Sequence, residues 1–181
     1  MIGNEIRDLS EGRWIRSEYG NPSVIIETPE VLIRANVGVP EGLETVIKEM
    51  STFSYGQKQD PFYIVLTTSK LAEPKEINLD DALEGALADL ERGGAKNMLV
   101  KREDFETDKG IKGMRAYGEF NVQVSDKKVL KEPSQYELLL FAQQDGLQQV
   151  LIVYQDDGRF SEGIKKRITD SIELEISESK K

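Results

Sequence analysis

The sequence predicts an α+β fold, in which an antiparallel β-sheet is flanked by helices on both faces as an α/β/α sandwich. The apolar stretches 136–143 and 147–155 lack the apolar–polar alternation of a strand with one solvent-exposed face. Other elements must therefore pack on both faces of this strand pair. Two amphipathic helices, predicted over 79–92 and about 160–172, are available as the covers. The run of consecutive strand candidates favours antiparallel pairing.

The 181 residues predict a single domain with a real core. We expect an irregular N-terminal segment over 1–22, the domain itself over 23–176 and a polar tail over 177–181. The first ten residues are polar and mixed in charge, so they do not read as a signal peptide or a membrane span.

The first third of the chain predicts short elements. Strands are predicted over 24–26 and 31–37, and apolar residues at helical spacing over 43–50 predict about two turns of helix. A hairpin with a longer loop is predicted from the β-rich stretches 52–55 and 62–68.

The clearest helix is predicted over 79–92. Asn78 is suited to cap its first turn, where Asp80 and Asp81 interact favourably with the helix dipole, and the glycine pair 93–94 ends it. Leucines and alanines recur along one side of this helix. We therefore expect its apolar stripe to pack on a sheet.

Strands follow over 98–105 and 111–124, and a polar loop over 126–133 separates them from the apolar pair. In that pair, Asp145-Gly146 predicts a two-residue type I′ turn, because both central residues need positive φ. Such a turn pairs Phe141 with Val150 and Leu139 with Ile152. One long helix is the alternative, and the β-branched residues of 150–153 make us favour strands.

A last helix is predicted to begin near 158–161. Phe160, Ile164, Ile168 and Ile172 recur at every fourth position and form a narrow apolar stripe. A short strand is predicted over 173–176.

The charge balance bears on partners. Asp and Glu number 33 against 24 Lys and Arg, a net charge of −9, and such a surface repels phosphate backbones and anionic lipid headgroups. We therefore expect no nucleic-acid partner and no direct binding of the domain to a membrane surface. The basic run Lys165, Lys166 and Arg167 is interpreted as a solvated helix face.

The chain contains no Cys and no His. This excludes cysteine nucleophiles, Ser-His-Asp triads, thiolate or imidazole zinc sites, and iron–sulfur ligation. We predict no catalytic, cofactor-binding or metal-binding residue, and no cofactor.

The order of these elements resembles the PsbP-like family. The resemblance covers about residues 24–176 and depends on "INLDDALEGALADLERGGAKN", "GIKGMRAYGEF", "YELLLFAQQDGLQQVLIVYQ" and the ending "ITDSIEL". It is closest to the bacterial branch of unassigned function.

The resemblance implies an α/β/α sandwich with an antiparallel sheet. It implies no common enzymatic activity, since family members act as binding or assembly factors. The metal binding of the photosystem member depends partly on histidine, so no functional residue is carried over to this chain. Bacterial members often sit outside the cytoplasmic membrane, which implies an extracytoplasmic domain tethered by an upstream anchor. A cytoplasmic location is the alternative.

Three glycines, Gly110, Gly113 and Gly118, raise the question of a phosphate loop. The spacing of the last two fits a P-loop, but Glu119-Phe120 stands where Lys-Ser/Thr is required. We interpret these glycines as belonging to a turn and to strands that pack close to backbone or aromatic groups.

Acidic and hydroxyl side chains give the remaining candidates. Asp156-Asp157-Gly158 with Glu162 lacks the spacing of a calcium loop and is interpreted as a turn and a cap. The neighbouring acids Glu103, Asp104 and Glu106 could serve a hydrolase only across a cleft. Ser134 and Ser161 have no His partner and start no Ser-x-x-Lys pattern.

Trp14, with Tyr19 nearby, is interpreted as an anchor of the N-terminal segment to the core, and a partner-facing hot spot is the alternative. Together these observations predict a non-catalytic binding or assembly domain directed to a protein partner. A small-ligand carrier or a carboxylate-based hydrolase is the alternative.

Overall fold

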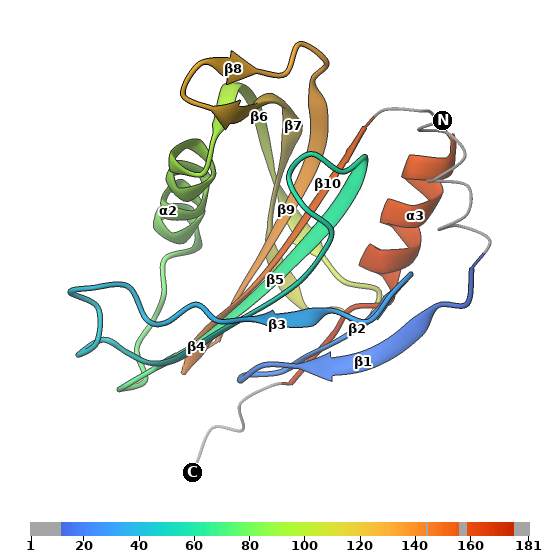
Figure 1. Cartoon of the computed structure of the whole chain (residues 1–181). Coiled ribbons are helices and arrows are strands. Elements are labelled where there is room, and N and C mark those ends of the chain that lie inside the picture. Colours follow the sequence, from blue (N-terminus) through green and yellow to red (C-terminus); the bar gives the residue numbers. More distant parts are fainter. Residues whose placement is uncertain (1–11, 144, 156–158, 176–181) are drawn as a thin grey trace.

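The computed structural model describes residues 12–143, 145–155 and 159–175, with the backbone alone at 159–161. Strands account for 52% of the structure and helices for 15%. The protein is therefore mainly an antiparallel β structure, built from two sheets and two short helices in the part described (Figure 1).

The large sheet forms the centre of the molecule. Its strand order is β3-β4-β5-β10-β9-β7-β6. Strand β8 pairs with the C-terminal end of β7, and every pairing described is antiparallel. The strands are β3 (Ile33–Ala35), β4 (Ile47–Tyr55), β5 (Phe62–Leu71), β6 (Ala95–Glu106), β7 (Lys112–Ser125), β8 (Lys128–Val129), β9 (Ser134–Gln143) and β10 (Gly146–Gln155).

A second sheet of three strands joins the two ends of the chain. It consists of β1 (Ile15–Tyr19), β2 (Val24–Thr28) and β11 (Glu173–Leu174), with β2 in the middle. This sheet and helix α3 (Arg159–Asp170) lie on one side of the large sheet, and helix α2 (Leu79–Arg92) lies on the other (Figure 1).

Both faces of the β9–β10 hairpin are buried, as predicted. Leu139, Phe141, Val150 and Ile152 pack with α3 and the small sheet. The intervening residues, including Leu138 and Leu151, pack against α2 instead. Because successive side chains of a strand point to opposite faces, this one strand pair contributes residues to two separate cores.

The predicted α/β/α sandwich is nevertheless wrong. Each face carries one short helix, and the face with α3 is covered jointly by the three-stranded sheet, which supplies Tyr19, Val24 and Ile26 to the core. The cover on that side is therefore largely β structure rather than a helical layer.

Two expectations for the first third of the chain are also corrected. Strand β1 lies within 1–22, the segment expected to be irregular, where Tyr19 is buried against the core. Residues 43–50 do not form a helix, because β4 begins at Ile47 and pairs with β5. A pattern of two helical turns is too short to stabilise a helix against such strand pairing.

The hairpin register differs from the predicted one. Leu139 pairs with Val150, and Phe141 pairs with Gln148. Strand β10 begins at Gly146, which pairs with Gln143, so Gly146 lies in the strand rather than in the turn. A side chain at Gly146 would overlap Pro22, so packing explains this glycine. The shift of two residues leaves every side chain on its predicted face.

The two helices agree with the prediction. Helix α2 has the predicted bounds, and the backbone N–H of Asp81 donates to Asn78 Oδ1 at 3.2 Å. In α3, Ile164 and Ile168 are buried. The side chain of Phe160 and the tail 177–181 lie outside the described residues. No helix in the described part is long and apolar enough to cross a membrane.

Candidate functional site

A pocket of about 570 Å³ lies between α2 and the large sheet, and we call it the α2 pocket. Its floor is apolar and comes from β5, β10 and β7, and the last turn of α2 and the loop 56–59 form its sides. The apolar side chains that line it are Tyr63, Val65, Ala86, Leu90, Ala95, Phe120, Val122, Val124 and Leu151. The volume lies within the range of about 300–1,000 Å³ that is usual for small-molecule sites.

Two charged residues line the pocket, and each has a partner. Lys58 Nζ donates to the backbone carbonyl of Gly93 at the end of α2, which attaches the loop 56–59 to the helix. The carboxylate of Asp89 forms an ion pair with Arg92. Asp89 is thus paired with a cation, whereas Lys58 keeps its positive charge because its partner carbonyl is neutral.

The polar groups of the lining are mainly amides. The residues Gln57, Gln59, Gln123 and Gln149 line the pocket, and their side chains have no hydrogen-bond partner among the residues described. Because Val122 and Val124 face α2, strand alternation directs the Gln123 side chain to the other face of β7. The Tyr63 hydroxyl likewise has none, and burial raises its pKa to about 12. Tyr63 therefore stays neutral at physiological pH and can both donate and accept a hydrogen bond.

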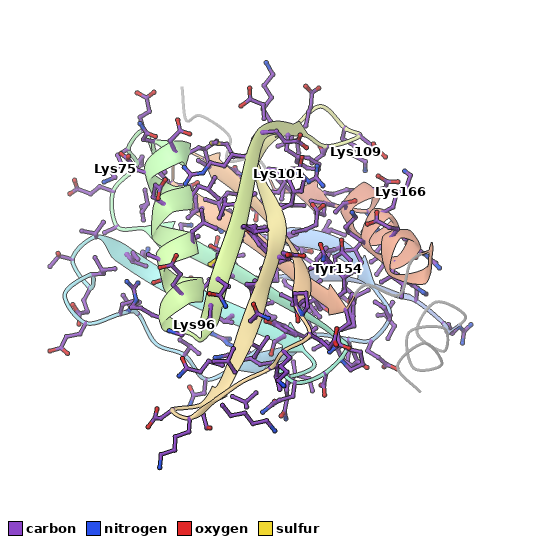
Figure 2. The ribbon with its side chains drawn as sticks, turned by 90° about the horizontal axis from the view of Figure 1, so that it is seen from above. Lys75, Lys96, Lys101, Lys109, Tyr154 and Lys166 are labelled. Carbon is purple, nitrogen blue, oxygen red and sulfur yellow. The ribbon has the colours of Figure 1, made fainter. Side chains whose placement is uncertain are left out.

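The two edges of the large sheet differ in character. Half of the twelve residues of β6 are charged, and Figure 2 labels Lys96 and Lys101 along this strand. Charges on an edge strand oppose pairing with another chain. The β3 edge carries fewer charges, since β3 has three residues of which Arg34 alone is charged.

Exposed apolar side chains are concentrated in one stretch of the sequence, which contains β3 and the residues on either side of it. Of the eight large apolar side chains exposed in the described part of the chain, five lie within residues 31–46, and we call these five the apolar edge segment. Its members are Val31, Ile33, Val37, Leu43 and Val46. Ile33 has an exposed fraction of 70% and pairs with Ser54, which lines the α2 pocket.

A buried ion cluster lies on the opposite face, next to α3. Glu137 is buried in β9, and Arg115 on β7 donates to both of its carboxylate oxygens, with Nε 2.7 Å from Oε2. Lys165 Nζ on α3 lies 3.4 Å from Glu137 Oε1. Figure 2 labels Tyr154, whose ring centroid lies 5.8 Å from Lys165 Nζ.

This cluster holds its cations in their charged forms. The hydrogen bond to Glu137 raises the pKa of Arg115 despite its partial burial. For Lys165, burial lowers the pKa, but the hydrogen bond to Glu162 and the charge of Glu137 offset this, so the net change is upward. The carboxylate of Glu137 is thus paired on both sides, which is the arrangement of a structural ion cluster rather than of a catalytic acid.

The glycines of "GIKGMRAYGEF" have the structural roles that the sequence indicates. Gly110 has φ of 83° in the turn before β7. A Cβ at Gly113 would overlap Leu140 O and the Phe141 ring, and one at Gly118 would overlap Leu99 O. Strand packing accounts for these positions, and no helix follows them as in a phosphate-binding loop.

The acidic and hydroxyl candidates do not converge. Glu103 pairs with Arg115, whereas its neighbour Asp104 lies on the other face of β6 by strand alternation. Ser134 is buried at the start of β9. Asp156, Asp157 and Gly158 and the Ser161 side chain lie outside the described residues. No group of three or more His, Cys, Asp or Glu within the described part could hold a metal ion.

Trp14 packs against the core beside α3, as expected of an anchor. The Arg167 guanidinium lies 4.2 Å from the centroid of its ring and also pairs with Glu27. The basic run 165–167 is therefore only partly a solvated face, since Lys165 and Arg167 join α3 to the sheets.

Sequence reasoning missed the pocket and the ion cluster. Glutamines at 57, 59, 123 and 149 carry no motif, and they meet only through the fold. Glu137 does give a signal, because it is an acid within the apolar stretch "YELLLFA". A buried acid of this kind requires a partner.

No protein-family model matches the chain, and no curated protein matches it. The resemblance to the PsbP-like family therefore stays a prediction from the sequence.

Proposed function

We propose that this protein is a non-catalytic binding or assembly domain whose partner is another protein. The observation that carries the proposal is the contrast between the two sheet edges. The β6 edge is charged, whereas β3 and the chain on either side of it carry the five residues of the apolar edge segment. Concentrated exposed apolar side chains are a feature of protein interaction surfaces.

The net charge of −9 supports a partner with a basic surface and opposes nucleic acid and anionic membranes. Resemblance to the PsbP-like family and the absence of Cys support an extracytoplasmic location behind an upstream anchor, with a cytoplasmic location as the alternative. A carboxylate-based hydrolase is less well supported, because Glu103 and Glu137 are both paired with Arg115, and Glu103 and Asp104 point to opposite faces of β6.

The proposal is tested by affinity capture from cells that produce the protein naturally. The double variant Ile33→Asp/Leu43→Asp places charges in the apolar edge segment. Leu99→Asp/Val100→Asp is the matched control, since these two exposed apolar residues lie on the β6 edge. We expect a stoichiometric protein partner with the wild type and the control, and its loss with the edge variant. Equal capture by all three proteins would place the interface elsewhere.

A further inference from the structure

We infer that residues 49–51 of β4 bind an extended segment of the protein partner as an added β-strand, in which basic and apolar residues alternate. We call these three residues the open β4 edge. The inference rests on the proposed function and deepens it, because it states how the partner pairs with the chain next to the apolar edge segment. It depends on the unpaired backbone of this edge, its acidic surroundings and the alternation of its side chains.

The backbone of the open β4 edge is paired on one side only. Residues 49–51 pair with β5 in regular register, whereas β3 pairs only with residues 52–54. The Val37 N–H donates to the Ala35 carbonyl in a tight turn that ends β3, and residues 36–46 then project from the sheet before β4 begins (Figure 1).

This edge can therefore accept a strand. Within the described part of the chain, no hydrogen bond reaches the backbone of 49–51 from the outer side. An open sheet edge presents N–H and C=O groups that an extended peptide satisfies by strand addition. Three residues suffice for pairing at this position, since β3 itself pairs with β4 over three residues.

The surroundings of the open β4 edge are acidic. Residues 41–49 contain three glutamates and one lysine. The exposed carboxylate of Glu49 accepts one hydrogen bond, from Asn21 Nδ2 at 3.2 Å. Lys70 is its neighbour in the register on β5, but no ion pair joins these two described residues. Glu49 can thus pair with a cation of an added strand, and the net charge of −9 favours the approach of a basic segment.

Strand alternation defines the sequence pattern of the segment. Glu49 lies on the side of the small sheet, where Asn21 contacts it, so the half-buried Met50 lies on the side of α2. Side chains that lie opposite each other on adjacent strands share a face. A strand beside this edge therefore places one side chain next to Glu49 and the following one next to Met50. A basic residue fits the first place and an apolar residue fits the second.

The test uses a fluorescein-labelled peptide of alternating lysine and valine, titrated into the purified protein at about 0.15 M salt, where long-range attraction is screened. The same peptide made with D-lysine keeps its charge, but its side chains cannot alternate between the faces of a strand. Glu49→Lys reverses the charge at the edge. Glu91→Lys is the matched control, because Glu91 is exposed on α2 and its replacement changes the net charge equally. Urea unfolding verifies that each variant is folded.

We expect saturable binding of one peptide per chain, measured by fluorescence anisotropy. The D-lysine peptide should bind at least about tenfold more weakly. Glu49→Lys should weaken binding by about fivefold or more, and Glu91→Lys should stay within about twofold of the wild type. In amide exchange followed by NMR, the amides of 49–51 that exchange quickly in the free protein should become protected, with unchanged exchange along β6.

Absence of saturable binding, an equal effect of Glu49→Lys and Glu91→Lys, or equally tight binding of the D-lysine peptide would overturn the inference. A dimer of the wild type that Glu49→Lys dissociates, measured by sedimentation, would also overturn it, because a second copy would then occupy the edge. The peptide titration needs no natural partner. A captured partner that is lost with Ile33→Asp/Leu43→Asp, together with no peptide binding, would refute the added strand alone and leave the proposed function standing.

Discussion

Glu137, a charged residue within the apolar strand β9, depends on Arg115 of the neighbouring strand β7 to balance its charge. The carboxylate is buried, with a side-chain exposed fraction of 3%, and its charge is balanced by Arg115 and Lys165. If either cation is removed, part of this charge stays buried without compensation.

We predict that Arg115→Met lowers the free energy of unfolding by about 3 kcal/mol, since breaking a buried pair leaves a buried charge. Arg92→Met, which breaks the exposed pair with Asp89, should cost less than about 1 kcal/mol. Urea unfolding at neutral pH measures both. Equal costs for the two variants would mean that the cluster is not a stabilising element.

Buried tyrosines predict a loss of stability at alkaline pH. Burial raises the pKa of Tyr63 and of Tyr136 from 10.0 to about 12. The folded protein keeps these protons while the unfolded chain loses them, so stability is complete below pH 10 and is lost as the pH rises toward 12.

The free energy of unfolding falls between neutral pH and about pH 11. In Tyr63→Phe this fall should be about 1 kcal/mol smaller than in the wild type, because the variant lacks this hydroxyl proton. The measurement is urea unfolding at both pH values. A parallel loss in the variant and the wild type would show that Tyr63 titrates normally.

At the scale of elements, the β9–β10 hairpin is the centre of both cores. Ile152 is fully buried between the sheet and the layer of α3 and the small sheet. Ile152→Ala should lower the free energy of unfolding by about 2–5 kcal/mol through the lost burial and the cavity. Leu99→Ala, at a position with an exposed fraction of 60%, should cost less than about 1 kcal/mol. Chemical denaturation distinguishes them, and a small cost at Ile152 would mean that its burial is misjudged.

Helix α2 and the buried hairpin were predictable because their signals are local. Asn78, the glycine pair 93–94 and the apolar stripe fix the helix bounds within one segment. The hairpin register was not predictable from the turn sequence. Gly146 is selected by contact with Pro22, which is far away in the chain, so a motif read locally assigns this glycine to the wrong position.

At the scale of the whole molecule, the fold class was misjudged because the second sheet is assembled from distant short pieces. Strands β1 and β2 are neighbours in the chain, but the third strand, β11, has only two residues and comes from the opposite end of the chain. Strands over 24–26 and 173–176 were predicted from the sequence, but their pairing into one sheet depends on tertiary structure. The α2 pocket was missed for the same reason, since its amides come from separate strands and loops.

The two edges of the large sheet give the molecule its asymmetry. One edge is long and charged, and the other is short and accompanied by the apolar edge segment. In the proposed interface, the partner contacts the short edge rather than the charged edge.

Hydrogen–deuterium exchange of the protein with and without its captured partner tests that claim most directly. The proposed interface predicts slower amide exchange over residues 31–46 in the complex, with unchanged exchange along β6 over 95–106. Protection of 95–106 without protection of 31–46 would contradict the account.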